Sequence, residues 1–432
     1  MKHETLIAGP LSADGTKGSQ RDQAAFSVKD SVGAFVPGKR IEWTATGKGV
    51  LDGLGCGIKD VFDIAGCATG YGNPEWERTH DVPSMDAVAV LKIRRHGAHI
   101  VGKTITDELA FSLAGNNYHY GSPVNTAAPD RLTGGSSCGS AAAVAAGLCD
   151  IGLGTDTAGS VRAPASFCGI YGFRSTHGLI SKDGICTLAQ SFDTVGWLTR
   201  DARTLAAVGR ALLSDMREPE QVSSWSSFDA AWSSLDDAVQ EQTASVLGGL
   251  ETSLGKSTSL SFDTAELDAY MDAFRIVQFY QVWKELGAWI QQAQPVLGPD
   301  VRERILTAST ITRGEYLAAS GVQRNVKQRF ESMLKDGRVL VMPTVSASAP
   351  LRSASVAELN RQRQTDLRFL CIASLAGLPQ VSIPALTLHD APLGLSIIGA
   401  AGTDVALLDL AATLEEQNVL KQSRKALPAP GV

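Results

Sequence analysis

The sequence has little of what marks membrane proteins, nucleic-acid-binding proteins or disulfide-stabilised proteins. Its 39 lysine and arginine residues stand against 45 aspartate and glutamate residues and form no basic stripe, so we expect neither nucleic acid nor a membrane surface as a partner. No apolar run approaches the length of a membrane span, and the first residues lack the apolar run of a signal peptide. The seven cysteines include no Cys-x-x-Cys pair. We therefore expect a cytoplasmic protein with reduced cysteines.

The remaining composition is that of an ordinary globular protein with a sizeable core. Apolar residues make up 44% of the 432 positions and charged residues 19%. Residues 1–45 are polar and dotted with glycine and serine, which predicts an irregular N-terminal arm. Residues 46–432 are predicted to form a single domain with a helix-rich section at about residues 201–335. Because strand patterns stand on both sides of that section, we expect one interrupted sheet.

Periodicity and capping signals predict the main elements of an α/β fold. We expect helices over residues 84–96, 140–148, 367–376 and 405–414, with Ser84 as the N-cap of the first and Gly377 closing the third. A long segment that contains Tyr270, Phe274 and Trp283 is also predicted to be helical. Short apolar runs at 98–101, 151–154, 339–342, 381–384 and 395–398 predict buried strands.

Two loops rich in glycine and hydroxyl side chains are the most informative feature. The first reads Gly134-Gly135-Ser136-Ser137-Cys138-Gly139-Ser140, and the second reads Gly154-Thr155-Asp156-Thr157-Ala158-Gly159-Ser160-Val161-Arg162. Such loops present many backbone N–H groups, which can stabilise an oxyanion. Upstream, Lys59 precedes a short apolar run, and burial there would lower its pKa enough for it to act as a base. The combination predicts a serine hydrolase that uses lysine in place of histidine.

Other interpretations of these residues are less favoured. Residues 135–139 match Gly-x-Ser-x-Gly, but a nucleophile elbow needs an apolar strand before it, and Pro-Asp-Arg-Leu-Thr at 129–133 makes a poor strand. No Gly-Lys-Ser/Thr follows the glycines, which excludes a phosphate-binding P-loop. His96 and His99 have no further ligand cluster, so we expect no metal site. Cys138 is an alternative nucleophile, although a single thiol in such a loop is more often packing.

Together with Lys59, the two loops resemble the amidase signature family, serine hydrolases with a Ser–cis-Ser–Lys triad. The 24 residues that separate Ser136 from Ser160 equal the expected spacing of that family's two catalytic serines, and the likeness continues to Gly172-Phe173-Arg174. Weaker similarity extends from about residue 53 to 201 and from 339 to 414. The resemblance implies an α/β fold with a large mixed central β-sheet covered by helices on both faces.

The resemblance also assigns roles to the site residues. Ser160 would be the nucleophile, Ser136, with a cis peptide bond before it, would relay the proton, and Lys59 would be the base. The backbone N–H groups of four consecutive residues would form the oxyanion hole: Thr157, Ala158, Gly159 and Ser160. Three further residues would support the loops: Ser137, Asp156 and Arg162. No cofactor and no metal are implied.

Two positions depart from the family pattern. Ala158 stands where the family usually has glycine, and Cys138 stands where glycine or serine is usual. Alanine still supplies an N–H group but disfavours positive φ, so we expect a slightly altered oxyanion loop. Activity is expected to survive this change.

Further segments resemble short amidases that act on indole-3-acetamide in plants, and their bacterial relatives. These segments lie at residues 71–76, 119–125 and 190–194. We therefore expect hydrolysis of a small-molecule carboxamide, an arylacetamide being the first candidate, to a carboxylic acid and ammonia through a seryl acyl-enzyme. Phe111, Ser112 and residues 116–118 are candidates to approach the substrate.

Three alternatives stay open at this point. The chain could hydrolyse urea-derived amides of the biuret or allophanate type, or act as a glutaminase-like subunit of a tRNA-dependent amidotransferase complex. It could also be a noncatalytic family member, which the presence of Lys59, Ser136 and Ser160 disfavours. A homodimer is expected by analogy alone.

Overall fold

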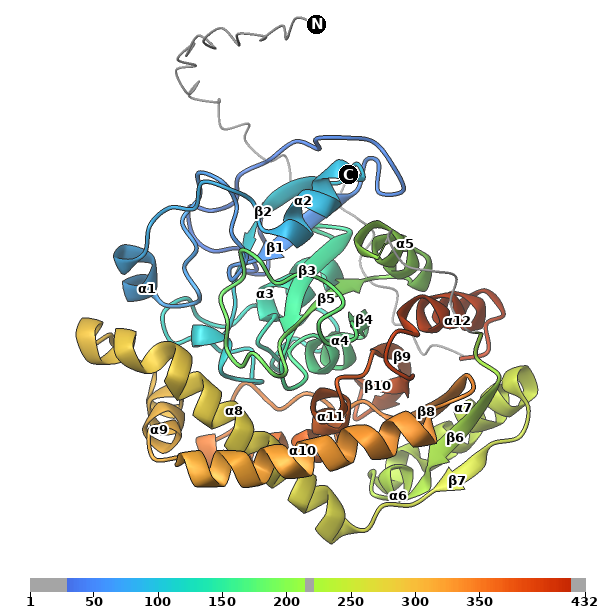
Figure 1. Cartoon of the computed structure of the whole chain (residues 1–432). Helices are drawn as coiled ribbons and strands as arrows, with labels where there is room; N and C mark the ends of the chain where they lie inside the picture. Colours follow the sequence, from blue (N-terminus) through green and yellow to red (C-terminus); the bar gives the residue numbers. More distant parts are fainter. Residues whose placement is uncertain (1–28, 214–220, 421–432) are drawn as a thin grey trace, which may run out of the picture.

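The computed structural model describes residues 29–213 and 221–420, which fold around one large sheet (Figure 1). Within these ranges ten strands run in the order β2-β1-β3-β5-β4-β9-β10-β8-β6-β7. Their bounds are β1 Gly55–Lys59, β2 His99–Thr104, β3 Ile151–Asp156, β4 Tyr171–Arg174, β5 Thr194–Thr199, β6 Ser224–Phe228, β7 Thr258–Leu260, β8 Arg338–Pro343, β9 Gln380–Leu388 and β10 Ala391–Ile398. Pairing is parallel at both ends of the sheet and antiparallel from β3 to β8, so the sheet is mixed.

Helices cover both faces of this sheet, which confirms the predicted α/β architecture. The helices are α1 Pro74–Thr79, α2 Val88–Arg95, α3 Cys138–Ala145, α4 Arg162–Cys168, α5 Ala202–Leu212, α6 Asp229–Ser233, α7 Gln240–Leu254, α8 Thr264–Ala293, α9 Pro299–Ala308, α10 Arg313–Met333, α11 Val356–Ala376 and α12 Asp404–Glu416. Two short 3₁₀ helices are η1 Glu108–Ala110 and η2 Asp237–Val239. α3 and α4 pack together against the central strands, whereas α2, α5 and α12 form a separate layer.

Small residues bring α3 and α4 close to the strands. A Cβ on Gly152 would lie 2.8 Å from the Ser140 carbonyl oxygen, and one on Gly172 would lie 2.5 Å from the Ala165 Cβ. α3 has the sequence CGSAAAVA, and all of its residues are buried. On the opposite face, the buried Trp197 donates its Nε1–H to a carbonyl of α5. The close approach on the first face places the loop before α3 directly against the carboxyl end of β3.

The described part of the N-terminal arm, residues 29–45, contains no helix or strand but packs against the sheet edge. Isolated bridges join Phe35 to Thr104 and Trp43 to Ile100, so this segment covers β2, the edge strand. Covering an edge strand shields its unpaired backbone groups from other chains. Residues 1–28 of the predicted arm lie outside the described residues.

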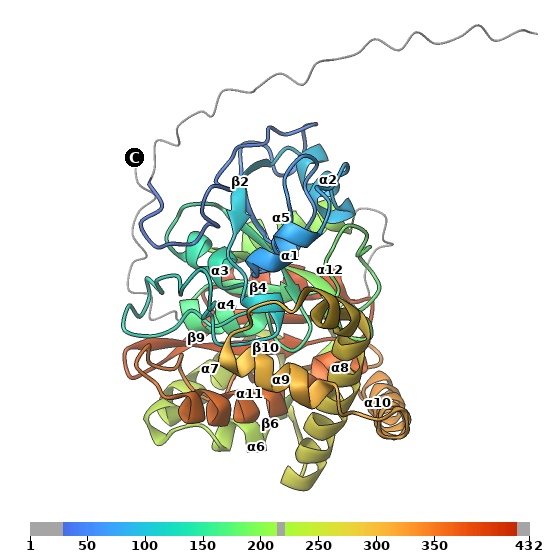
Figure 2. The same cartoon turned by 90° about the vertical axis from the view of Figure 1, so that its left-hand side faces the viewer.

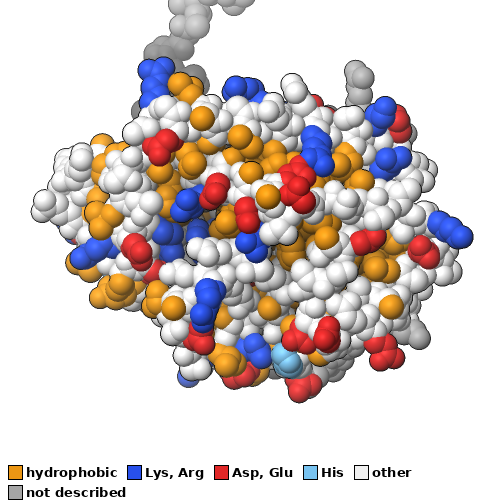
Figure 3. Space-filling model, turned by 90° about the horizontal axis from the view of Figure 1, so that it is seen from below, with side chains coloured by type: hydrophobic (Ala, Val, Ile, Leu, Met, Phe, Trp, Pro, Cys, Tyr) orange, Lys and Arg blue, Asp and Glu red, His pale blue; other side chains and the backbone are white. Residues whose placement is uncertain are grey.

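The helix-rich section adds both helices and strands to the sheet. β6 and β7 from this section continue the sheet beyond β8. α8 and α10 lie side by side across one end of the molecule (Figures 1 and 2). Seen from that end, the surface carries lysine, arginine, aspartate and glutamate side chains interspersed with apolar patches (Figure 3). None of the helices in the described ranges is long and apolar enough to cross a membrane.

Two predicted helix starts are wrong. α2 begins at Val88 with Ala87 as its N-cap, not at Ser84, because Asp86 is held elsewhere: its carboxylate accepts from Ala65 N–H and pairs with Arg94. α11 begins at Val356, well before residue 367. Its first turn is fixed by a capping box in which Ser355 and Glu358 exchange hydrogen bonds. The predicted closure at Gly377 is confirmed, since this residue is in the left-handed conformation with φ of 70°.

Candidate active site

Lys59 is the last residue of β1 and is completely buried. Its Nζ donates to Ser136 Oγ at 2.8 Å and to Thr155 Oγ1 at 2.9 Å. Burial lowers the pKa of Lys59 to about 8, while the nearby Asp107 carboxylate opposes this shift. A lysine with this pKa is partly neutral near physiological pH, and only the neutral amine can accept a proton.

Ser136 lies in the loop before α3, and the peptide bond between Gly135 and Ser136 is cis. Backbone hydrogen bonds hold the loop on both sides. Asp107 N–H donates to the Ser136 carbonyl at 3.0 Å, and Ser137 N–H donates to the Ser160 carbonyl at 3.1 Å. A Cβ on Gly135 would lie 2.2 Å from the Asp107 carboxylate, so only glycine fits there. The two serine loops are therefore joined directly through their backbones.

Ser160 lies between β3 and α4 and is 3% exposed. It lines a small cavity whose other residues are mostly apolar: Ala110, Phe111, Ser112, Leu113, Thr157, Ala158, Leu188, Gln278 and Arg363. The structure thus joins Lys59 to Ser136 by a side-chain hydrogen bond, and it joins the Ser136 loop to Ser160 by a backbone hydrogen bond.

Asp156 anchors the loop that carries Ser160. Its carboxylate accepts from Gly159 N–H at 2.9 Å and Val161 N–H at 3.1 Å, and it forms buried ion pairs with Arg162 at 2.7 Å and Arg174 at 3.0 Å. Burial alone would raise the pKa of Asp156, but the two guanidinium groups and the N–H donors hold it well below its usual range. The carboxylate is therefore ionised at neutral pH and fixes the loop.

Removing this charge is expected to destabilise the fold. Asp156→Asn leaves two buried guanidinium groups without a counter-charge, so we expect a loss of about 3 to 5 kcal/mol in the free energy of unfolding. Urea denaturation measures this loss. Asp272→Asn is the matched control, because Asp272 pairs with Arg275 on the surface at 3.5 Å with side chains more than half exposed, and we expect less than about 1 kcal/mol there. Equal losses in the two variants would contradict the anchoring role.

The four N–H groups proposed for the oxyanion hole are not equivalent. Gly159 N–H donates to Asp156 Oδ1 and is engaged inside the loop. Within the described residues, the N–H groups of Thr157, Ala158 and Ser160 have no protein acceptor. These three are available to an oxyanion at Ser160.

Ala158 does not adopt the positive φ that alanine disfavours. The positive φ falls on Gly159, at 117°, and Ala158 is not among the described residues with positive φ. A Cβ on Gly159 would also lie 2.6 Å from Leu370. The reason given for an altered loop therefore does not apply, because the positive φ falls on Gly159 and not on Ala158.

Cys138 is unsuited to act as a nucleophile. Its side chain is fully buried, and its Sγ donates to the Ile105 carbonyl at 3.4 Å. Burial, together with the nearby Asp107 carboxylate, raises the pKa of the Cys138 thiol well above its ordinary value. A thiol without accessible thiolate is inert packing.

The sequence interpretation missed three residues that hold the site. Thr155 accepts from Lys59, Asp193 accepts from Thr157 Oγ1 at 2.6 Å, and the Asp107 carboxylate accepts from Gly115 N–H at 3.1 Å beside the Ser136 loop. Thr155 and Asp193 belong to segments that resemble the family, but nothing in a linear sequence shows that they face the site. Ser137, predicted to be supporting, donates its Oγ–H to the Thr155 carbonyl at 3.3 Å.

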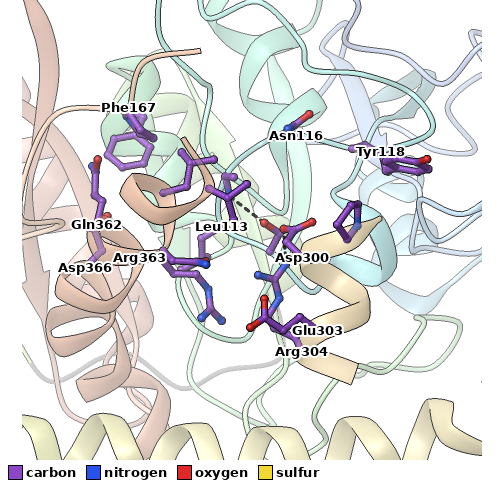
Figure 4. A pocket seen from close by; sticks show the side chains of 18 of the residues that line it. Leu113, Asn116, Tyr118, Phe167, Asp300, Glu303, Arg304, Gln362, Arg363 and Asp366 are labelled. Carbon is purple, nitrogen blue, oxygen red and sulfur yellow. Dashed lines mark hydrogen bonds and ion pairs between the residues drawn. The ribbon is translucent and has the colours of Figure 1, made fainter. Parts of the chain in front are cut away.

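A cleft of about 480 Å³ adjoins the small cavity at Ser160, and Figure 4 shows side chains that line this cleft. Ser112, Leu113 and Arg363 line both spaces, so the two lie next to each other. The walls of the cleft come from residues 112–121, from α9 and from α11.

Comparison with known proteins identifies the family. The family model described as Amidase matches residues 38–251 and 228–408. The sequence is 38% identical to Amidase 1 of Arabidopsis thaliana over 90% of this chain and 99% of that protein. The chain belongs to the amidase signature family. It is accordingly an amidase, a hydrolase of amides.

Solved structures agree with this assignment. A crystal structure of an amidase matches with a TM-score of 0.77 and 28% identity, covering 86% of each chain. The structure of a glutamyl-tRNA(Gln) amidotransferase subunit from Thermotoga maritima matches with a TM-score of 0.76 and 26% identity, covering 93% of this amidase and 91% of that chain. The mixed sheet and its helical layers are therefore those of the family.

Proposed function

We propose that this amidase hydrolyses a small primary carboxamide through an acyl-enzyme on Ser160. The observation that carries the proposal is the hydrogen bond of 2.8 Å from the buried Lys59 Nζ to Ser136 Oγ, in a loop tied to Ser160 by its backbone. A buried amine of lowered pKa, a relaying hydroxyl and a hydroxyl at a cavity are the parts that serine acylation requires.

Acylation begins when Ser160 Oγ attacks the amide carbonyl carbon. The Ser160 proton passes to Ser136, and the Ser136 proton passes to neutral Lys59. The carbonyl oxygen becomes an oxyanion, which the N–H groups of Thr157, Ala158 and Ser160 stabilise. The C–N bond then breaks, the proton returns along the same path to the leaving nitrogen, and ammonia departs.

Deacylation repeats this chemistry with water. Water attacks the ester carbon on Ser160, and its proton follows the path to Lys59. The ester C–O bond breaks, Ser160 regains its proton, and the carboxylic acid leaves. Lys59 is thus restored to its neutral form at the end of the cycle.

The arylacetamide expected from the sequence resemblance is the first substrate to test. The cavity and cleft contain apolar side chains that suit an organic group beside the amide, among them Phe111, Leu113 and Phe167. A second candidate function is that of an ammonia-supplying glutaminase-like subunit, which the likeness to the amidotransferase protein favours. That function would require a partner and glutamine as the amide.

Ammonia release from a panel of amides tests the proposed function. The panel contains indole-3-acetamide, biuret and glutamine, with the Ser160→Ala variant as the blank. We expect ammonia from at least one primary amide with wild-type protein and none above background with the variant. Activity confined to glutamine would favour the second candidate. Equal ammonia release by the variant would contradict the acyl-enzyme proposal.

A further inference from the structure

Arg363 places a guanidinium group where the cleft meets the Ser160 cavity. It lies on α11 and lines both spaces. Figure 4 shows Arg363 and Arg304 reaching the cleft from two helices, α11 and α9. Arg363 and Ser160 line the same small cavity, so one short substrate can contact both residues.

Arg363 lacks a partner for its charge. Among the described residues, none accepts a hydrogen bond from Arg363 or forms an ion pair with it, and its Nε is buried. The arginines nearby and in the core are different. Arg304 pairs with Asp300 at 2.8 Å, while Arg162 and Arg174 share Asp156. A guanidinium with a buried, unpartnered donor is costly unless a ligand supplies the acceptor.

The acidic groups around Arg363 are engaged or exposed. Asp300 is held by Arg304, and Asp366 accepts from both the N–H and the hydroxyl of Ser346. Glu303 is exposed at the rim. Burial lowers the pKa of Arg363 to about 9, the nearby Arg304 charge adds to this shift and the Asp300 carboxylate opposes it, so the group still carries its proton at neutral pH. Within the described residues, no carboxylate therefore forms an ion pair with Arg363.

The same cavity holds a second unsatisfied polar group. Gln278, on α8, is 2% exposed, and its Oε1 has no hydrogen-bond partner among the described residues. This oxygen is an acceptor, so it is suited to an N–H of the ligand. The cavity thus offers one donor fork and one acceptor beside Ser160, and a purely apolar substrate would satisfy neither.

We propose that Arg363 binds a carboxylate of the substrate, so that this amidase acts on short primary amides that carry a carboxylate at their other end. The inference rests on the proposed function, because it places the scissile amide at Ser160. A guanidinium fork binds a carboxylate through two parallel N–H···O bonds, which fixes orientation as well as charge. Neutral arylacetamides then become reference substrates rather than the preferred ones.

Binding to the Ser160→Ala variant tests this proposal without turnover. Calorimetry compares succinamate with butyramide, a neutral amide in which a methyl group takes the place of the carboxylate-bearing end. We expect succinamate to bind at least about 30-fold more tightly, because its carboxylate and the partly buried guanidinium of Arg363 form a charged pair. Adding Arg363→Gln should reduce this ratio to about 1 to 3. Arg361→Gln, which removes an exposed arginine of the same helix, should leave the ratio unchanged.

The outcomes are distinct. Equal binding of the two amides, or a preference that survives Arg363→Gln, would overturn the proposal. Arg363→Lys provides a second variant that keeps the charge and loses the fork, so an intermediate ratio is expected even if the glutamine variant folds poorly. Allophanate as a third ligand has a shorter, one-atom spacer between amide and carboxylate, and tighter binding of either anion than of butyramide supports the inference. Ammonia release by wild-type protein is measured separately, so a failure of hydrolysis with the binding preference intact would contradict the proposed function alone.

Discussion

Replacing Ser160 with alanine is expected to lower kcat by about 100,000-fold or more, to the level of the background reaction. In the proposed mechanism the hydroxyl of Ser160 forms the covalent bond, and loss of a nucleophile removes every step that depends on it. The three free N–H groups beside Ser160 remain in the variant, so substrate binding should change by less than about 3-fold. Ammonia release under saturating amide measures kcat.

Ser137→Ala is the matched control for this experiment. Ser137 lies beside Ser136, and its hydroxyl donates to the Thr155 carbonyl at 3.3 Å rather than to Lys59. We expect a loss of no more than about 10-fold in kcat, because only a supporting hydrogen bond is removed. If Ser137→Ala were as damaging as Ser160→Ala, the division of roles between the serines would be wrong.

Replacing Lys59 with alanine is expected to lower kcat/KM by about 1,000- to 10,000-fold near neutral pH, since the general base is lost. The wild-type rate should depend on pH in a defined direction. With its pKa lowered to about 8 by burial, Lys59 is protonated at low pH and cannot accept the proton. As the pH increases toward 8, kcat/KM should therefore rise about tenfold per pH unit, and above pH 8 it should level off.

A pH profile of kcat/KM from 6 to 10 measures this dependence. Lys182→Met is the control, because Lys182 is partly exposed and its Nζ donates to the Gln190 carbonyl. It should keep the wild-type profile. A profile that is flat between pH 6 and 9, or a Lys59→Ala variant with near-normal turnover, would contradict the role of Lys59.

The sequence predicted those parts of the fold where local signals are strong. Buried strands such as β3 and β8 follow from short apolar runs, and the end of α11 follows from Gly377. α3 could be predicted because its residues are almost all small. The predicted helix starts were wrong where polar residues begin a helix. The first turns of α11 carry no apolar stripe, although Ser355 followed by Glu358 is a capping-box signature that could have revealed them.

That missed boundary has a consequence for the site. Arg363 lies in the part of α11 that precedes the predicted helix, so the sequence did not indicate it as a pocket residue. Gln278 was missed for another reason, since it lies on a long helix whose apolar positions indicate only core packing. Both residues reach Ser160 through tertiary structure, from helices more than 100 residues away in sequence. No linear pattern contains that information.

Unlike Arg363 and Gln278, the three candidate catalytic residues could be predicted from the sequence, because their spacing matches the family pattern. Lys59, Ser136 and Ser160 could be proposed from two loops and one lysine, and the structure adds the hydrogen bond that connects the lysine to Ser136. It also adds two contacts that the pattern could not give. Gly159 N–H donates to the Asp156 carboxylate, and Lys59 Nζ donates to Thr155 as well as to Ser136. The backbone geometry, rather than residue identity, decides both points.

Locating the covalent adduct of a fluorophosphonate tests the account most directly. Trypsin cleaves after Arg131 and Arg162, so a single peptide, residues 132–162, contains Ser136, Ser137, Cys138 and Ser160. Fragmentation of this peptide by mass spectrometry identifies the modified residue. We predict modification at Ser160 alone, with labelling that slows as the pH falls below 8. An adduct on Ser136, Ser137 or Cys138, or undiminished labelling of the Ser160→Ala variant, would contradict Ser160 as the nucleophile.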